Sequence, residues 1–223
     1  MNLLNSNTLQ SKNREIYQQI KNGLLNKEWK HGEKLSTYEL AKQYNVSKTP
    51  VQDALKQLEY DGFVNIIPQV GCIVKTFIQE DIEEIFLLRI SLEGLAASLA
   101  ATKANEIDLL NLEKLIQQME HFDANKNYSQ YSLANREFHR VIIEAARSPR
   151  LLSQILWLWD QADFINIHEH LIHQIIDNSI EKHKIIYQAI QNNIPQIAKT
   201  AMEEHLKECL QLISEFNRVA GDG

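Results

Sequence analysis

A group of cationic and hydrogen-bonding side chains lies between residues 47 and 59. Lys48, Thr49, Gln52 and Lys56 fall on one side of a helix if this stretch is helical, because spacings of three and four residues relate them. Amide side chains can read base edges in the major groove of DNA, and ammonium groups can pair with its phosphates. The stretch is therefore a candidate recognition helix, although an ordinary solvated helix can carry the same residue types.

The opposite face of this stretch is apolar. Val51, Leu55 and Leu58 stand at i, i+4 and i+7, which predicts one buried side. We expect Ser47 to cap the first turn, and Pro50 is tolerated there because the first amide donors of a helix have no intrahelical partner. The pattern predicts one amphipathic helix from about residue 47 to residue 59.

Shorter elements flank this helix. Residues 12–27 carry a helical stripe of apolar side chains, and Ser36 with Glu39 forms a capping box that opens a helix through about Tyr44. Two short β-like runs and the turn between them follow, and together they would form a wing: residues 63–67, 68–71 and 72–75.

From about residue 79 the pattern is helical almost to the end, without strand-like alternation. Breaks rich in Asn, Asp and Pro separate six predicted helices: residues 79–102, 105–123, 128–146, 149–175, 179–192 and 195–218. Asn178 with Glu181 is a plausible capping box for the fifth, and the long fourth could be broken near Asp160. The predicted fold class is mainly α, with an N-terminal winged helix-turn-helix over residues 1–76 and a C-terminal all-α, six-helix antiparallel bundle over residues 77–223.

Charge is divided unevenly between these two predicted domains. The net charge of the chain is −6, but residues 1–76 carry +3 and residues 77–223 carry −9. The first domain can bind DNA and the second repels it. Two distant cysteines without a metal-type spacing indicate a reducing interior. No apolar run approaches membrane-spanning length and no secretory signal is recognisable, so we expect a cytoplasmic protein without a membrane partner.

The N-terminal part resembles the winged helix-turn-helix of GntR-type bacterial transcription regulators over roughly residues 12–76. The resemblance rests on motifs that stand in order at the spacings of this family: Gly32-Glu33-Lys34-Leu35-Ser36, Glu39-Leu40-Ala41, Val46-Ser47-Lys48-Thr49-Pro50-Val51, Ala54-Leu55 with Leu58, and Gly62-Phe63-Val64. It implies that double-stranded DNA is contacted by Ser36, Tyr38, Ser47, Lys48, Thr49, Gln52, Lys56, Gln69 and Gly71. Tyr38 could equally serve in packing.

Three positions depart from the recognition helix that this resemblance implies. The family often has Arg where this chain has Lys48, Gln52 and Lys56. Lysine keeps the charge but loses the bidentate fork, and Gln52 is better suited to adenine edges. We therefore expect an A·T-rich or otherwise atypical palindromic operator. One wing-and-helix unit covers only a half-site, so we also expect a homodimer that pairs through the bundle.

The bundle resembles the FCD domain, the all-helical effector domain of the fatty-acid-regulator branch of the same family. The motifs are Leu88-Arg89 with Leu92-Glu93, Asn135-Arg136-Glu137-Phe138-His139-Arg140, Glu181-Lys182-His183 and Glu204-His205-Leu206. The resemblance implies a divalent metal, Zn²⁺ or Ni²⁺, on Asn135, His139, His183 and His205. Neutral imidazoles with one oxygen donor suit such a cation. The alternative is a set of hydrogen-bonded interior histidines.

One of these ligands departs from the family pattern, which commonly has Asp where this chain has Asn135. An amide oxygen is a weaker, neutral donor, so we expect a lower metal affinity but still expect binding through the three histidines. A second histidine group, His168, His170 and His173, does not align with these ligands, and we expect it to be structural or solvated.

A small carboxylate effector is expected within the same bundle. Arg89 could hold a carboxylate with its planar guanidinium fork, or it could pair with Glu93 four residues later. Tyr131, one helical turn before Asn135, could line the cavity that holds the effector or serve as a core tyrosine. Trp157 and Trp159 cannot both face the same side of a helix, so we expect one of them at an interface.

These features together predict a transcription regulator, with a repressor the commoner case, whose operator affinity responds to a small organic acid. A dedicated metal sensor is one alternative. A metal-dependent enzyme is another, but Glu137 lies only two residues from His139 and so points elsewhere on the helix. No other carboxylate is obviously placed as a general base. We expect no enzyme.

Overall fold

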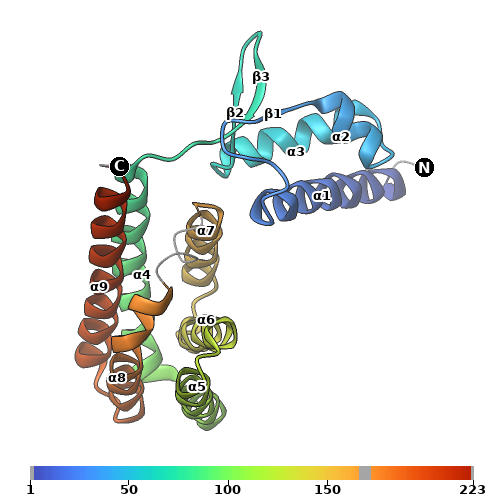
Figure 1. Cartoon of the computed structure of the whole chain (residues 1–223). Coiled ribbons are helices and arrows are strands. Elements are labelled where there is room, and N and C mark those ends of the chain that lie inside the picture. The colour runs from blue at the N-terminus through green and yellow to red at the C-terminus, as the bar shows by residue number, and fades with distance from the viewer. Residues whose placement is uncertain (1–2, 166–171, 222–223) are drawn as a thin grey trace. The chain divides into compact units, whose positions relative to one another are not determined.

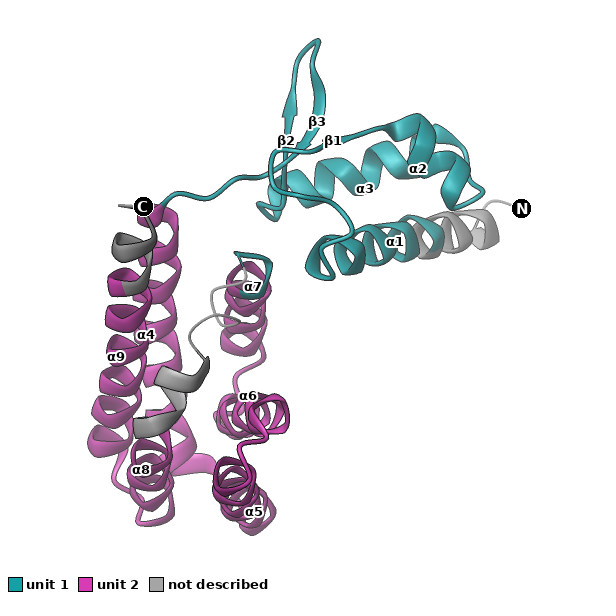
Figure 2. Cartoon of the chain, in the orientation of Figure 1, with its two compact units in different colours: residues 1–78, 163–165 teal, residues 79–162, 166–223 magenta. Residues whose placement is uncertain are grey.

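The computed structural model describes residues 3–165 and 172–221, with the side chains of residues 12–165 and 179–215. The chain forms two compact units (Figure 2): residues 1–78 with 163–165, here the N-terminal unit, and residues 79–162 with 166–223, here the helical unit. The first division falls two residues after the boundary expected from the sequence.

The N-terminal unit is a winged helix-turn-helix (Figure 1). Its elements in chain order are α1 Leu3–Leu25, β1 Lys34–Leu35, α2 Thr37–Gln43, α3 Lys48–Tyr60, β2 Val64–Ile67 and β3 Gly71–Val74. The sheet is antiparallel in the order β1-β3-β2, with Val64 opposite Val74 and Ile67 opposite Gly71. The fold class expected from the sequence is confirmed, while β1 was not predicted because two residues are too short to show an alternation.

Local sequence explains the turn that joins α2 to α3. Asn45 has a φ of 54°, in the left-handed region that asparagine tolerates better than most residues. At the start of α2 the Ser36 hydroxyl accepts a hydrogen bond from the Glu39 backbone nitrogen at 3.3 Å, so Ser36 caps that helix. Ser47 occupies the corresponding position of α3, but its side chain makes no capping bond. The predicted capping by Ser47 is therefore wrong, while the helix it precedes is present.

The helical unit consists of six helices within the described part of the chain. They are α4 Gln79–Lys103, α5 Glu106–Ala124, α6 Tyr128–Ala145, α7 Pro149–Ile165, α8 Ile172–Gln191 and α9 Pro195–Gly221. The fourth is ten residues shorter than predicted, and the fifth begins seven residues earlier. Asn178 lies inside α8 and cannot be its N-cap. Residues 166–171, between the two helices, lie outside the described part of the chain.

The core of the helical unit is built from stripes on all of its helices except α7, which packs on a smaller cluster beside α4 and α6. Its largest buried members include Leu112, Met119, Phe138 and Ile142. Gly94 of α4 permits a close approach to α9, because a Cβ there would lie 2.7 Å from Cγ of Glu203. This packing places α6, α8 and α9 around one interior point, which the histidines occupy.

Helix α4 corrects the expectation that no apolar run approaches membrane-spanning length. Among the described residues, α4 alone is long and apolar enough to cross a bilayer, and 56% of its most apolar window is buried inside the bundle. It carries a buried ion pair and packs against α9, α6 and α8. Its apolar character is explained by its position as a core helix, because a helix with buried residues on more than one side needs no polar face there.

Candidate DNA-binding face and metal site

The exposed side of α3 carries the predicted recognition residues. Lys48, Thr49, Gln52 and Lys56 are all exposed, while Val51, Leu55 and Leu58 are buried against the core of the N-terminal unit. The helix thus has the two faces that its spacing predicted. The exposed face offers two ammonium groups, one hydroxyl and one amide, all on a single helix.

Tyr38 extends this face onto α2. The Lys48 Nζ atom lies 5.5 Å from the centre of the Tyr38 ring, and the Tyr38 side chain is 64% exposed. An exposed ring under an ammonium is not a core tyrosine, so the packing alternative for Tyr38 is wrong. The cation–π contact joins Lys48, the first residue of α3, to α2.

Three polar contacts hold α3 in place. The Tyr17 hydroxyl donates to Asp61 at 2.7 Å and joins α1 to the end of α3. The Glu59 carboxylate accepts from the Ile66 backbone nitrogen at 2.7 Å and joins α3 to the wing strand β2. Asp53, an exposed acidic group on α3, accepts from Asn13 at 3.2 Å.

The wing turn is the remaining part of the predicted DNA face. Gln69 has a φ of 64° and is exposed, and Gly71 has a φ of 118°, a conformation that strongly favours glycine. A Cβ at Gly71 would lie 3.0 Å from the Lys34 side chain, so the Lys34 chain runs along the wing. Sequence reasoning missed Lys34, which is a cation beside the turn although it precedes the wing by more than thirty residues.

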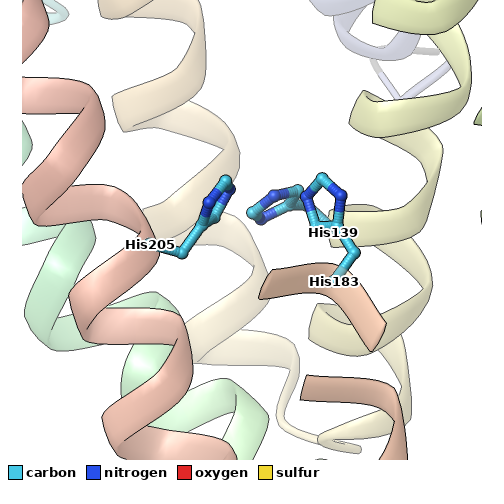
Figure 3. A group of neighbouring side chains, drawn as sticks. All are labelled: His139, His183 and His205. Carbon is cyan, nitrogen blue, oxygen red and sulfur yellow. The ribbon is translucent and has the colours of Figure 1, made fainter. Parts of the chain in front are cut away.

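Three histidines meet inside the helical unit (Figure 3). His139 comes from α6, His183 from α8 and His205 from α9. One potential ligand atom of each lies within 4.8 Å of the others, and the ring centroids are 4.8–5.5 Å apart. All three side chains are buried. The convergence of these residues on one point, predicted from the sequence, is present.

Burial keeps two of these imidazoles neutral. Burial, followed by the neighbouring His205 and His139, lowers the pKa of His183 well below its ordinary value. Burial and the neighbouring His139 lower the pKa of His205 to about 3. Neither ring nitrogen of His183 has a hydrogen-bond partner among the described residues. Hydrogen-bonded interior histidines would not leave both nitrogens unpaired, so this ring offers a free lone pair to a cation.

A fully buried carboxylate borders the cluster. Glu93 of α4 accepts hydrogen bonds from Arg89 Nε at 2.8 Å, from Trp159 Nε1 at 2.8 Å and from His139 Nδ1 at 3.1 Å. Burial alone would raise the pKa of Glu93, but the Arg89 guanidinium and the two other donors lower it to about 2. Sequence reasoning considered Glu93 only as a partner of Arg89 and missed its contacts with α6 and α7, which only the tertiary fold creates.

The other side chains considered in the sequence of the helical unit have different environments. Asn135 is partly exposed, one helical turn before His139 on α6. Arg89 forms the predicted ion pair with Glu93. Tyr131 is buried in the main core, where burial raises its pKa. Glu137 is exposed, as its spacing from His139 predicts.

Two further aromatic and histidine predictions have different outcomes. Trp159 is 4% exposed and Trp157 is 37% exposed, so the two rings face different sides of α7 as predicted. The side chains of His168, His170 and His173 lie outside the described residues.

Two protein-family models match the chain. The model of bacterial regulatory proteins of the gntR family matches residues 12–74, and the FCD domain model matches residues 84–208. Together they cover both units. The FCD match alone spans more than half of the chain.

Curated relatives and solved structures agree with these matches. The chain is 26% identical to YdhC, an uncharacterised HTH-type transcriptional regulator of Bacillus subtilis, over 88% of this chain and 92% of YdhC. It is 25% identical to the HTH-type transcriptional repressor GlaR of Escherichia coli, over 89% and 94% of the two chains. The solved structure of McbR/YncC from E. coli superposes with a TM-score of 0.73 at 22% identity, over 92% and 98% of the two chains, which shows a shared fold. The chain belongs to the GntR family of bacterial transcriptional regulators and carries an FCD domain.

Proposed function

We propose that this regulator binds a palindromic, A·T-rich operator as a homodimer and that a small organic acid, held in the helical unit on a divalent metal, controls its operator affinity. The observation that carries the metal part is His183, whose two ring nitrogens are buried without a partner beside two other histidines. An unpaired buried polar group costs about 1–3 kcal/mol, and bonding one nitrogen to a cation removes part of that cost.

The donor set suits Zn²⁺ or Ni²⁺. His139, His183 and His205 would supply three imidazole nitrogens, and Asn135 on the same face of α6 would supply an amide oxygen. Borderline divalent cations prefer imidazole ligands. The bound cation would supply a Lewis-acidic positive charge inside the bundle, and the side chains would provide no compensating anionic ligand because Asn135 replaces a carboxylate.

Charge balance favours an anionic effector. Arg89 and Glu93 cancel each other, and the lowered pKa values of His183 and His205 keep both rings neutral. A divalent cation would therefore leave two uncompensated positive charges in a buried site, which is costly. A carboxylate from a small organic acid would offset this charge. The guanidinium of Arg89, whose Nε atom keeps its bond to Glu93, and the hydroxyl of Tyr131 are the side chains we assign to the effector itself.

Control of DNA binding requires that the effector stabilise one of two arrangements of the protein. In the simplest form the acid favours an arrangement with lower operator affinity, so that the protein acts as a repressor released by its ligand. Lys48, Thr49, Gln52 and Lys56, with Ser36, Tyr38, Ser47, Gln69 and Gly71, are the proposed DNA contacts.

The dimer expected on a palindromic operator needs a surface for pairing. Leu87, Leu88 and Leu95 of α4 are large apolar side chains that are exposed along one side of this helix. We assign this side to a second copy of the chain. Light scattering of wild type and of a Leu88→Glu/Leu95→Glu variant tests it: a monomeric variant with unchanged helicity supports the assignment, and an unchanged dimer contradicts it.

The metal and effector are tested together on the full chain. Metal content is measured in gently purified wild type and in a His139→Ala/His205→Ala variant, and we expect near one equivalent in the first and near zero in the second. Equal, near-zero metal in both would contradict the metal proposal. Operator affinity is then measured with metal alone and with metal plus a panel of small organic acids.

A dedicated metal sensor is the second candidate function, and the deep burial of the three histidines favours it because little of their surface is open to a further ligand. If metal alone changes the operator affinity and no acid changes it further, the metal is itself the signal. If metal alone leaves the affinity unchanged and an acid alters it, the effector proposal stands.

A further inference from the structure

The buried carboxylate of Glu93 joins three helices at the edge of the histidine cluster. Its Oε2 atom faces His139 Nδ1 on α6 at 3.1 Å, and its Oε1 atom accepts from Arg89 on α4 and from Trp159 on α7. Glu93 has an exposed fraction of 0%. The carboxylate of Glu93 is therefore shared by the guanidinium of Arg89, the indole of Trp159 and the candidate metal ligand His139.

This arrangement decides which nitrogen of His139 carries a proton. A carboxylate flanked by a guanidinium stays ionised and can only accept hydrogen bonds. The facing Nδ1 must therefore carry hydrogen, whether the ring is neutral or protonated. In the neutral ring the lone pair is then on Nε2, the atom left to face a cation. Hydrogen bonding of this kind to the far nitrogen also orients the ring and makes it a better donor.

We propose that Glu93 is a positioning residue that fixes the tautomer and direction of His139 and that links occupancy of the histidine cluster to the indole of Trp159. The proposal rests on the metal site proposed above. It concerns this chain's own carboxylate and tryptophan, which are not among the proposed ligands.

The link to Trp159 follows from the shared acceptor. A cation on Nε2 of His139 makes its Nδ1–H a stronger donor, which draws negative charge of Glu93 toward Oε2 and away from Oε1. The indole N–H of Trp159 is bonded to Oε1, so its environment must change when the cluster is filled. The guanidinium of Arg136 lies 5.0 Å from the ring of Trp159 and holds its other side. Trp157, two residues earlier, is 37% exposed and lies on another side of α7.

The first test reads the tautomer of His139 in the metal-free full chain, by nitrogen-15 NMR of labelled histidines near pH 8, with His139→Gln used for assignment. Glu93→Gln is compared with Glu144→Gln, a matched change on α6, where Glu144 makes an exposed ion pair with Arg140. We expect His139 to be the Nδ1–H tautomer in wild type and Glu144→Gln, and to lose this single tautomer in Glu93→Gln. An Nε2–H tautomer in wild type, or no change in Glu93→Gln, overturns the proposal.

The second test titrates zinc ions into the same proteins, with circular dichroism to confirm that each is folded. We expect the zinc dissociation constant to rise about 10- to 100-fold in Glu93→Gln and to stay within about twofold in Glu144→Gln. Equal affinity in wild type and Glu93→Gln overturns the positioning role. If wild type binds no zinc, the metal site fails, while the tautomer experiment still decides the role of Glu93.

Tryptophan fluorescence during the zinc titration tests the link to α7. We expect a zinc-dependent change in wild type and Trp157→Phe, and its loss in Trp159→Phe with zinc binding retained. A change that persists in Trp159→Phe, or that disappears in Trp157→Phe instead, contradicts the link.

Discussion

The two units of this chain arrange their polar chemistry in opposite ways. In the N-terminal unit the candidate functional groups are exposed: Lys48, Gln52 and Lys56 project from one helix, and the core beneath them is apolar. In the helical unit the polar groups are inside, where His183 and Glu93 have no exposed surface at all. The N-terminal unit presents ammonium and amide groups at its surface, where a large polyanion such as DNA can reach them. The helical unit encloses imidazoles and a carboxylate, which suit a small ligand or an ion.

This difference changes what each side chain contributes to stability. An exposed lysine on α3 is solvated in the free protein, so its loss should leave the fold intact. A buried group such as Glu93 is stable only with its partners, so function and folding are inseparable there. Variants of the two units should therefore separate into those that change binding alone and those that also change stability.

Acid should produce the largest contrast between the units. The pKa values of His183 and His205 are lowered from 6.5, and that of Glu93 from 4.5 to about 2. The unfolded chain then binds more protons than the folded one below pH 6.5, so stability is lost as the pH falls through that value. For His205, with a folded pKa of about 3, the loss at pH 4 is roughly 3 kcal/mol, and His183 adds to it.

The measurement is urea unfolding of the metal-free chain between pH 8 and pH 4, followed by fluorescence. Trp29 reports on the N-terminal unit and Trp159 on the helical unit, so variants that retain only one of them separate the two transitions. We expect the Trp159 transition to collapse first on acidification. A Trp29 transition that is equally acid-labile would remove the contrast. Saturating zinc should protect the helical unit in the same range if the histidines bind it.

Removal of Glu93 should have the next largest effect. In Glu93→Ala the guanidinium of Arg89 is left buried without its partner, which costs about 3–5 kcal/mol. The matched change Glu144→Ala removes an exposed pair with Arg140 and should cost about 0–1 kcal/mol. Chemical denaturation of both variants measures the two losses in the free energy of unfolding and so compares them. Similar losses would mean that burial of the Glu93 network contributes little.

More of the candidate site could be predicted from the sequence in the N-terminal unit than in the helical unit, because periodicity reports the faces of one helix but not the contacts between helices. The face of α3 depends on spacings within thirteen residues, so the positions of Lys48, Gln52 and Val51 followed from periodicity alone. The three histidines come from helices far apart in the chain, and their convergence was predicted only through family resemblance. The carboxylate of Glu93 between His139 and Trp159 has no sequence signal, because neither spacing nor composition encodes which helices touch.

Boundaries failed where the local pattern carried no information. The single helix predicted over residues 149–175 takes in the end of α7, the start of α8 and residues 166–171, which lie outside the described part of the chain. β1 was missed because two residues show no period, and Lys34 was missed because its proximity to Gly71 depends on strand pairing. These errors concern a helix boundary, a very short strand and a contact between elements, while the existence and type of the long helices were predicted correctly.

Substitution of Gln52 should affect binding and leave stability almost unchanged. A bidentate amide–adenine contact contributes about 1–3 kcal/mol of discrimination, so Gln52→Ala should weaken binding to the preferred operator about 5- to 150-fold. The operator is first selected from random duplexes, and affinity is measured at fixed salt. We expect Gln52→Ala to flatten preference at one base pair of each half-site, and Lys56→Ala to weaken all sequences alike. A guanine-rich core at the Gln52 position would contradict the predicted readout.

The smallest expected effect distinguishes two serines that look equivalent in the sequence. Ser36 and Ser47 each precede a helix of the N-terminal unit, but only the Ser36 hydroxyl accepts a backbone hydrogen bond, at 3.3 Å from Glu39. Ser36→Ala should therefore destabilise the N-terminal unit by about 1 kcal/mol, and Ser47→Ala by only a few tenths.

Ser47 is exposed beside Lys48, so its substitution should instead lower operator affinity if its hydroxyl meets a phosphate. Urea unfolding and operator titration of both variants give a crossed pattern in that case, because a capping group acts on folding and a DNA contact acts on binding. Equal loss of stability in the two variants would show that Ser47 caps α3 in solution and that its free hydroxyl is not reserved for DNA.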